Sequence, residues 1–168
     1  MYKSLAWNKT ALLQSPLFAP LNPILSRIKD EQFPSLPTCN NLLAEYQPNI
    51  TVQQGLPLRF VAQVLGKQGF ESQYEPRCYL KGEVQMREAN WHDLLNALVW
   101  LTFPKSKAAI NARHYHALTN ATTQVTGSQR GAVRDVNTLL DESGVIVVCA
   151  DAELATLLCD FQWQELFW

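Results

Sequence analysis

The sequence NWHDLLNALVWLTFPKSKAAINARHYH occupies residues 90–116 and organises the rest of the fold. Its first half predicts a helix that begins after Asn90, a good N-cap, with Asp93 three positions later where a carboxylate meets free backbone N–H groups. Pro104 is typical of the first turn of a helix and predicts a second one over about 104–120. Two helices with so short a link form a hairpin or a sharp corner.

Three other segments predict strands. Residues 58–65 are rich in β-branched and apolar side chains, residues 77–86 alternate around Gly82, and residues 145–149 form a continuous β-branched run, as in a strand that is buried on both faces. We therefore expect an α+β fold in which a small sheet packs on the helix pair 91–120.

Further helices are expected near the C-terminal end of the chain. One covers about 129–140 and should turn Val133, Val136 and Leu140 inward, and a final helix begins at Asp151.

Residues 1–57 hold seven of the nine prolines, which prevents long regular elements. Short helices fit between the prolines: one at 23–29 that turns Ile24, Leu25 and Ile28 to one face, and one capped by Thr38 that carries Leu42, Leu43 and Tyr46. We predict a proline-rich wrapping segment over 1–57 and an α+β core over 58–168.

The net charge of −1 hides an uneven distribution of charge. Residues 94–134 hold five basic groups and no acidic one, whereas residues 135–168 hold seven acidic groups and no basic one. The two blocks either pair with each other or leave the basic block facing an anionic ligand.

Composition and cysteine usage indicate a cytoplasmic protein. The chain is 47% hydrophobic and 17% charged, so a sizeable core is expected. The four cysteines lack CxxC spacing, no signal peptide is evident, and the longest apolar stretch, 94–103, is about half of the ~20 residues that a membrane span needs.

Histidines carry the main chemical signal. His92 and Asn96 stand one turn apart on a helix that is apolar nearly all round, so we expect them in a protected place. Lys107, Asn111 and His114 form a second stripe on the next helix. If the stripes face each other, they form a polar site with His92 as general acid or base and Asp93 orienting it.

Two other interpretations of these residues stay open. The stripes can be a hydrogen-bond network that fixes the pairing of the two helices, with Asp93 as a helix cap. His92, His114 and Asp93 also make a partial metal shell, but they lack the spacing of a recognised motif, and no metal or cofactor is assigned. His116 should face solvent.

Arg130 and Arg134 lie one turn apart after a Thr-Gly-Ser loop. Two guanidinium groups at a helix start suit a phosphate or a carboxylate, and Lys107 would assist them. Pairing of the arginines with Asp141, Glu142 or Asp93 is the alternative.

The stretch quoted first, together with YEPRCYLKGEVQMRE before it and RGAVRDVNTLLDESGVIVV after it, resembles the uncharacterised bacterial family called Domain of Unknown Function 3025. The resemblance covers most of the chain from about residue 17. The residues that carry it are Tyr74, Glu75, Gly82, Val84, Arg87, Asn90, Trp91, His92, Asp93, Asn96, Ala97, Trp100, Phe103, Pro104, Lys107, Asn111, His114, Arg134, Asp135, Asp141, Glu142 and Gly144.

This resemblance implies no activity, substrate or cofactor. It does imply several dozen further residues after the point that matches Trp168, and the aromatic end of the chain agrees, because free termini are usually polar. We expect a missing segment or a second subunit to cover Phe161, Trp163, Phe167 and Trp168.

The sequence therefore supports two functions from different classes. The first is an enzyme or binding protein for a small phosphate-bearing or carboxylate-bearing ligand, which uses His92, Asp93, Asn96, Asn111 and His114, with Lys107, Arg130 and Arg134 on the anion. The second is a non-catalytic interaction or assembly protein in which the same polar residues are structural. A nucleic-acid ligand is disfavoured by the overall charge of −1.

Overall fold

The computed structural model describes residues 6–66, 69–123, 136, 138–141, 144 and 147–167. The chain divides into two compact units, Met1–Asn137 and Thr138–Trp168.

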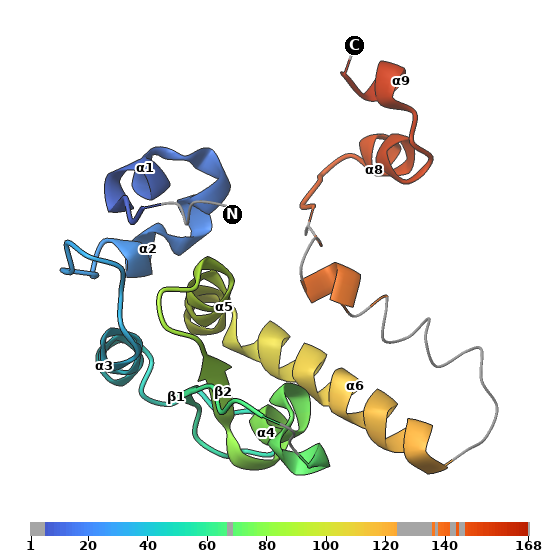
Figure 1. The fold of residues 1–168 in the computed structure, drawn as a ribbon. Coiled ribbons are helices and arrows are strands. Elements are labelled where there is room, and N and C mark those ends of the chain that lie inside the picture. Colours follow the sequence, from blue (N-terminus) through green and yellow to red (C-terminus); the bar gives the residue numbers. More distant parts are fainter. Residues whose placement is uncertain are drawn as a thin grey trace. The chain divides into compact units, whose positions relative to one another are not determined.

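The first unit is mainly helical, with a small sheet (Figure 1). In chain order its elements are α1 (Lys9–Gln14), η1 (Pro16–Leu21), α2 (Asn22–Leu25), α3 (Leu36–Tyr46), β1 (Arg59–Ala62), η2 (Phe70–Ser72), α4 (Tyr74–Lys81), β2 (Glu83–Met86), α5 (Trp91–Thr102) and α6 (Pro104–Thr123). The second unit holds α8 (Ala152–Cys159) and α9 (Trp163–Phe167). The predicted α+β class is confirmed.

The sheet consists of β1 and β2, which pair in parallel with Phe60 opposite Val84. Parallel strands need a crossover connection, and α4 lies within it. All four residues of β2 are buried, so this strand runs through the interior of the unit. The strand predicted over 58–65 is confirmed in its central part, which is β1.

The strand predicted over 77–86 is only half right. Residues up to Lys81 form helix α4, and only the part from Glu83 onward is a strand. Gly82 separates them: its φ of +67° ends the helix in the left-handed conformation, and its N–H bonds to the Cys78 carbonyl at 2.9 Å. A Cβ at this position would lie 2.2 Å from the Pro57 carbonyl oxygen, so only glycine fits.

Glu83 connects this sheet to α4. It is buried, and its carboxylate accepts hydrogen bonds from Arg59 on β1 and from Arg77 on α4. Burial alone would raise the pKa of Glu83, but the bonds from Arg77 and Arg59 lower it. The ion pairs therefore keep a charged group stable inside the unit.

The two predicted central helices are confirmed. The Asn90 side chain accepts a hydrogen bond from the Asp93 backbone N–H at 3.1 Å, and Pro104 begins α6 directly after Phe103. The apolar circumference of α5 explains its central place, since Leu94, Leu98, Trp100 and Leu101 are among the most buried side chains.

Short helices of the proline-rich N-terminal segment pack against α5 and also supply part of the core. Ile24, Leu25 and Ile28 are buried in the same cluster as Trp100. In the short helix α3, however, the N-cap is Ser35, whose hydroxyl accepts from the Thr38 backbone N–H. Thr38 was the wrong choice of cap because Leu36 and Pro37 already form the first turn.

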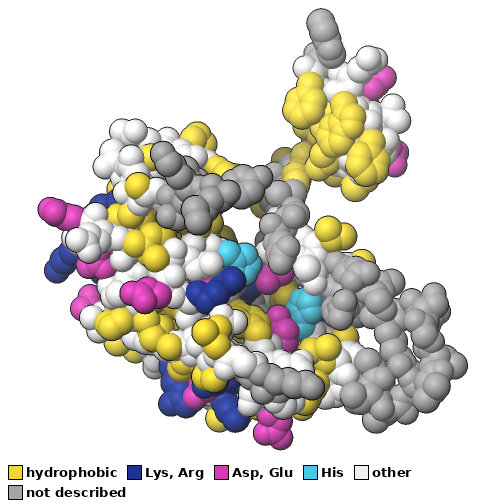
Figure 2. All heavy atoms as spheres, in the orientation of Figure 1, with side chains coloured by type: hydrophobic (Ala, Val, Ile, Leu, Met, Phe, Trp, Pro, Cys, Tyr) yellow, Lys and Arg dark blue, Asp and Glu magenta, His cyan; other side chains and the backbone are white. Residues whose placement is uncertain are grey.

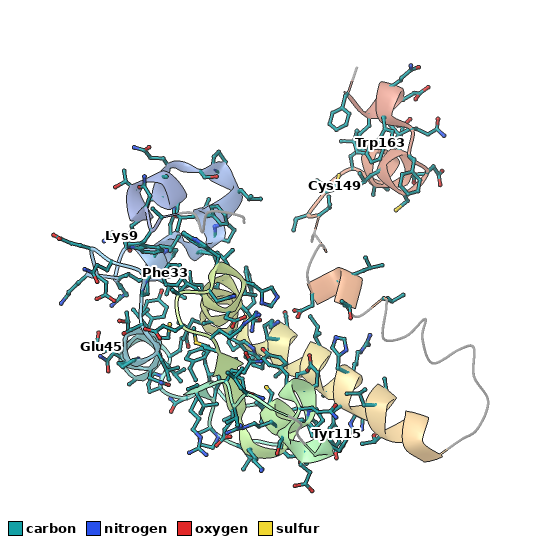
Figure 3. The ribbon with its side chains drawn as sticks, in the orientation of Figure 1. Lys9, Phe33, Glu45, Tyr115, Cys149 and Trp163 are labelled. Atoms are coloured by element: carbon teal, nitrogen blue, oxygen red, sulfur yellow. The ribbon has the colours of Figure 1, made fainter. Side chains whose placement is uncertain are left out.

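Aromatic rings hold this segment against α5. Phe33 meets Trp91 edge to face at 5.2 Å between ring centroids, and Trp7 lies 5.7 Å from the same ring. Figure 3 labels Phe33 in this N-terminal region.

Two predictions for the C-terminal region are wrong for those of their residues that the structure describes. Residues 147–149 form no strand, and Val147 and Val148 are exposed. Val136 and Leu140 are also exposed rather than turned inward. An apolar run becomes a strand only beside a neighbour that completes its backbone hydrogen bonds, and residues 147–149 have none among the described strands. Residues 145, 146 and 129–135 lie outside the described part of the chain.

Candidate functional site

The site begins in the loop between β2 and α5. Arg87 follows the last residue of β2, and Asn90 is the N-cap of α5. Ala89 between them has a φ of +48°, in the left-handed region that a side chain rarely adopts. This turn brings Arg87 back to the first turn of α5, where Asp93 lies.

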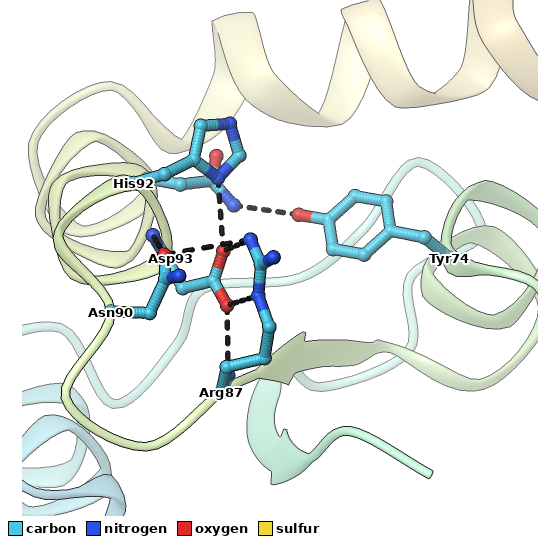
Figure 4. Close-up of polar contacts among 6 residues, drawn as sticks. Tyr74, Arg87, Asn90, His92 and Asp93 are labelled. Carbon is cyan, nitrogen blue, oxygen red and sulfur yellow. Dashed lines mark hydrogen bonds and ion pairs between the residues drawn. The ribbon is translucent and has the colours of Figure 1, made fainter. Parts of the chain in front are cut away.

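Asp93 is held by four hydrogen bonds (Figure 4). Its Oδ2 accepts from the Arg87 backbone N–H and from Arg87 Nε, each at 2.8 Å. Its Oδ1 accepts from an Arg87 Nη2 at 2.8 Å and lies 2.9 Å from His92 Nδ1. The two guanidinium bonds form a bidentate pair, a strong and directional contact for a carboxylate.

These bonds decide the charge of Asp93. Burial alone would raise the pKa of the carboxyl group, but the hydrogen bonds from Arg87 and His92 lower it from 3.8 to about 2. The bond to Asp93 in turn raises the pKa of Arg87. Asp93 is therefore an ionised carboxylate at neutral pH.

The position of His92 corrects the expectation of a protected place. Its side chain is 67% exposed, while that of Asp93 is 9% exposed. Because an ionised carboxylate can only accept, the proton of a neutral His92 ring lies on Nδ1, which donates to Asp93. Nε2 is then the acceptor of the ring. The structure thus gives an exposed imidazole with a fixed tautomer on a buried carboxylate.

Asn96 stands one turn after His92 and is half-buried. Its Nδ2 donates to the hydroxyl oxygen of Tyr74 at 2.6 Å (Figure 4). Tyr74 is the first residue of α4, so this bond connects α5 to the crossover helix. Asn96 therefore joins α5 to the start of α4 one turn away from His92.

The second stripe is buried. Lys107, Asn111 and His114 are each between 4% and 6% exposed. Asn111 Nδ2 donates to the carboxylate of Glu75 at 2.5 Å and to the Glu75 backbone carbonyl at 3.1 Å. Lys107 Nζ lies 5.9 Å from the centroid of the Trp100 ring, within reach of a cation–π interaction.

Asn96 and Asn111, one from each stripe, bond to neighbouring residues of α4 rather than to each other. Asn96 bonds to Tyr74 and Asn111 to Glu75. Among the described residues, no hydrogen bond or ion pair joins His114 to His92 or Asp93. The candidate site thus has an exposed part around His92 and a buried part between α4 and α6.

The buried part also contains Cys78 of α4, which is fully buried. Burial raises the pKa of its thiol, the Glu75 carboxylate raises it further, and Lys107 lowers it. Cys78 is therefore a protonated thiol that packs like an apolar side chain, rather than a nucleophile.

Several predictions concern metal, anion and membrane binding. In the described segments, no three His, Cys, Asp or Glu side chains gather as a metal site would require. Arg130 and Arg134, the predicted anion ligands, lie outside the described residues. None of the described helices has the length and apolarity needed to span a membrane.

Three residues of the site were missed as functional candidates, namely Tyr74, Glu75 and Arg87. Each belongs to the set that carried the family resemblance, which was a usable signal. Because a strand was expected over 77–86, helix α4 was not foreseen. The hydrogen bonds of Tyr74 with α5 and of Glu75 with α6 were therefore not predicted. Nothing in the local pattern shows that Arg87 turns back onto Asp93.

Comparison with known proteins agrees with the resemblance seen in the sequence. The family model described as "Protein of unknown function (DUF3025)" matches residues 58–168, more than half of the chain. The match contains every residue of the site described above. No curated protein and no solved structure matches the chain. The chain belongs to the DUF3025 family of proteins of unknown function.

Proposed function

We propose that this chain is an enzyme that acts on a small molecule bearing a phosphate or a carboxylate, with His92 as its general acid or base. The observation that carries the proposal is the 2.9 Å contact between His92 Nδ1 and Asp93 Oδ1 on a carboxylate that Arg87 holds from two sides. A side chain kept only for stability would have no need of an exposed imidazole at the end of this chain of bonds.

The arrangement suits proton transfer at His92 Nε2. A substrate O–H or N–H group that contacts Nε2 can give up its proton there, and the imidazolium that forms is stabilised by the Asp93 carboxylate. Arg87 has an indirect part: it keeps Asp93 ionised and in place. Asn96, half-buried one turn away, would position the substrate beside the ring.

The anionic part of the substrate is assigned to Arg130 and Arg134. Support comes from the sequence, where both lie in a block of five basic and no acidic residues that includes α6. Lys107 is buried next to Trp100, so it would attract the anionic ligand by its charge from a distance and not by direct contact. Asn111 and His114 are buried and would support the site from the interior. No cofactor is proposed.

A ligand screen followed by a turnover assay tests this function. Thermal unfolding of the wild-type chain is measured with inorganic phosphate, pyrophosphate and a panel of phosphorylated and carboxylated metabolites, and stabilising compounds are then incubated with the protein and followed by NMR. We expect Arg134→Ala to abolish the thermal shift. His92→Asn should keep the shift but stop turnover. An unchanged thermal shift in Arg134→Ala would remove Arg134 from the proposal, and unchanged turnover in His92→Asn would remove His92.

A second candidate, a non-catalytic interaction or assembly protein, is favoured by one observation. The bonds of Asp93, Asn96 and Asn111 all join different elements of the fold, which is also what a purely structural network does. If the panel gives no ligand, and if His92→Ala lowers stability as much as His114→Ala does, this candidate replaces the first.

We place the protein in the bacterial cytoplasm. The four cysteines are free thiols, and Cys39 and Cys78 are buried, as is typical of proteins from a reducing compartment. A nucleic-acid ligand is not part of the proposal, because the net charge of the chain is −1.

A further inference from the structure

The second unit carries an exposed aromatic patch, formed by Phe161, Trp163 and Phe167. Their exposed fractions are 71%, 48% and 79%. The rings of Phe161 and Trp163 lie 5.7 Å apart and those of Trp163 and Phe167 lie 6.3 Å apart, so the patch is continuous. Hydrophobic side chains gather visibly on the part of the chain formed by α8 and α9 (Figure 2), where Figure 3 labels Trp163.

Acidic residues flank this patch in the sequence. The segment 138–168 has six acidic residues and no basic one. Asp160 precedes Phe161 directly, and Glu165 lies between Trp163 and Phe167; both carboxylates are exposed. A partner for this surface must therefore combine apolar contact area with positive charge.

The first unit has a surface of that kind along α6. Lys105, Ala109 and Arg113 are exposed and follow each other in steps of four, so they share one face of the helix. Phe103, 43% exposed, stands immediately before this helix. Ala109 leaves room between the two cations, and the whole stretch 94–134 contains no acidic residue that would repel the patch.

We propose that the partner of the aromatic patch is a second copy of this chain. The patch of one copy packs on the Phe103, Lys105, Ala109 and Arg113 face of the other, and the second copy returns the same contact. A two-fold dimer contains both contacts. It removes six aromatic rings from water. Fully exposed rings would bury about 900–1,500 Å² in total, and these rings are only partly exposed, so the two α6 faces supply the rest of a standard interface of about 1,200–2,000 Å².

Charge reversal tests this dimer without disturbing buried residues. By sedimentation equilibrium of the full chain, we expect the wild type to form a species of twice its 19.0 kDa mass. Lys105→Glu with Arg113→Glu makes both surfaces acidic, and Asp160→Lys with Glu165→Lys makes both basic. Each double variant alone should dissociate at least about tenfold more readily.

The two double variants mixed together give the decisive measurement. Each contact in the mixed dimer again joins an acidic surface to a basic one, so the mixture should regain the dimer that neither variant forms alone. A wild type that stays monomeric at every concentration overturns the proposal. So does a mixture that stays monomeric, which points instead to contacts within one chain or to another partner.

The aromatic contribution has its own variant and control. Phe161→Ser with Phe167→Ser should weaken the dimer at least about tenfold, because these rings supply most of its apolar area. Leu17→Ser with Leu65→Ser removes two apolar side chains that are 79% and 88% exposed in the first unit and should leave it unchanged. Equal effects of both pairs would show non-specific association and would also overturn the proposal.

Discussion

The two histidine-bearing parts of the site differ in what surrounds the ring. The His92 side chain is 67% exposed and rests on a carboxylate that has four bonds, whereas His114 is 6% exposed and lies in the interior next to Asn111. One ring can meet a ligand and the other contributes to packing. The difference shows that a histidine on an apolar helix is not necessarily buried, because a side chain in the first turn of the helix can point into solvent.

The largest effect is expected at the carboxylate beneath the exposed ring. Asp93→Asn should lower the free energy of unfolding by about 2–3 kcal/mol, because it replaces a charged acceptor by an amide whose N–H group would face the Arg87 donors. Urea unfolding measures this loss. A loss below about 0.5 kcal/mol would mean that the pair is no more than a surface salt bridge.

His114→Ala should cost about 2 kcal/mol, because a buried side chain is removed and a cavity remains in its place. Comparison of its urea midpoint with that of wild type checks the value. Ser106→Ala is a control at an exposed position of the same helix and should change the stability by less than about 0.5 kcal/mol. If the two variants lose the same amount of stability, burial of His114 does not stabilise the fold as described.

The third expectation concerns pH. The pKa of Asp93 is lowered in the folded state, so its contribution to stability is complete above the ordinary value of 3.8 and is lost as the pH falls through about 2. Arg87 is half exposed, which reduces the gain to about 1–2 kcal/mol. The stability difference between wild type and Asp93→Asn should therefore shrink between pH 5 and pH 2. A constant difference would contradict the assigned charge.

The smallest effect is expected at the exposed ring itself. His92→Ala should lower stability by less than about 0.5 kcal/mol, because the ring is mostly in water and Asp93 keeps its three bonds from Arg87. Thermal unfolding at pH 7 and pH 5 checks this. A loss close to that of His114→Ala would remove the contrast between the two rings and with it the main support for a role in proton transfer.

Local signals predicted the centre of the fold well. The cap at Asn90, the proline at 104 and the apolar circumference of α5 all act within a few residues, and all three predictions were confirmed. The prediction of a strand over 77–86 was wrong up to Lys81. The same pattern of residues around Gly82 also fits a helix that ends at this glycine and is followed by a strand. Only the close approach of Pro57 shows why glycine stands there.

The site was predicted in part. His92, Asp93, Asn96 and Asn111 all take part in the hydrogen bonds described, but their partners Tyr74, Glu75 and Arg87 were not foreseen. Asn111 and Glu75 are 36 residues apart, and Asn96 and Tyr74 are 22 apart. Pairs so distant in sequence come together only when the crossover helix is placed, and no periodicity within one element reveals them.

By itself the sequence determined the helices around residue 90, the family of the chain and the separation of basic and acidic blocks, because these depend on local spacing, on the residues that match the family pattern or on composition. Tertiary structure alone decided that His92 is exposed while Asp93 beneath it is buried. Exposure and charge depend on the turn at Ala89, which brings Arg87 onto the first turn of α5, and a turn of this kind arises from the packing of β2 and α5 and not from the residues of either element alone.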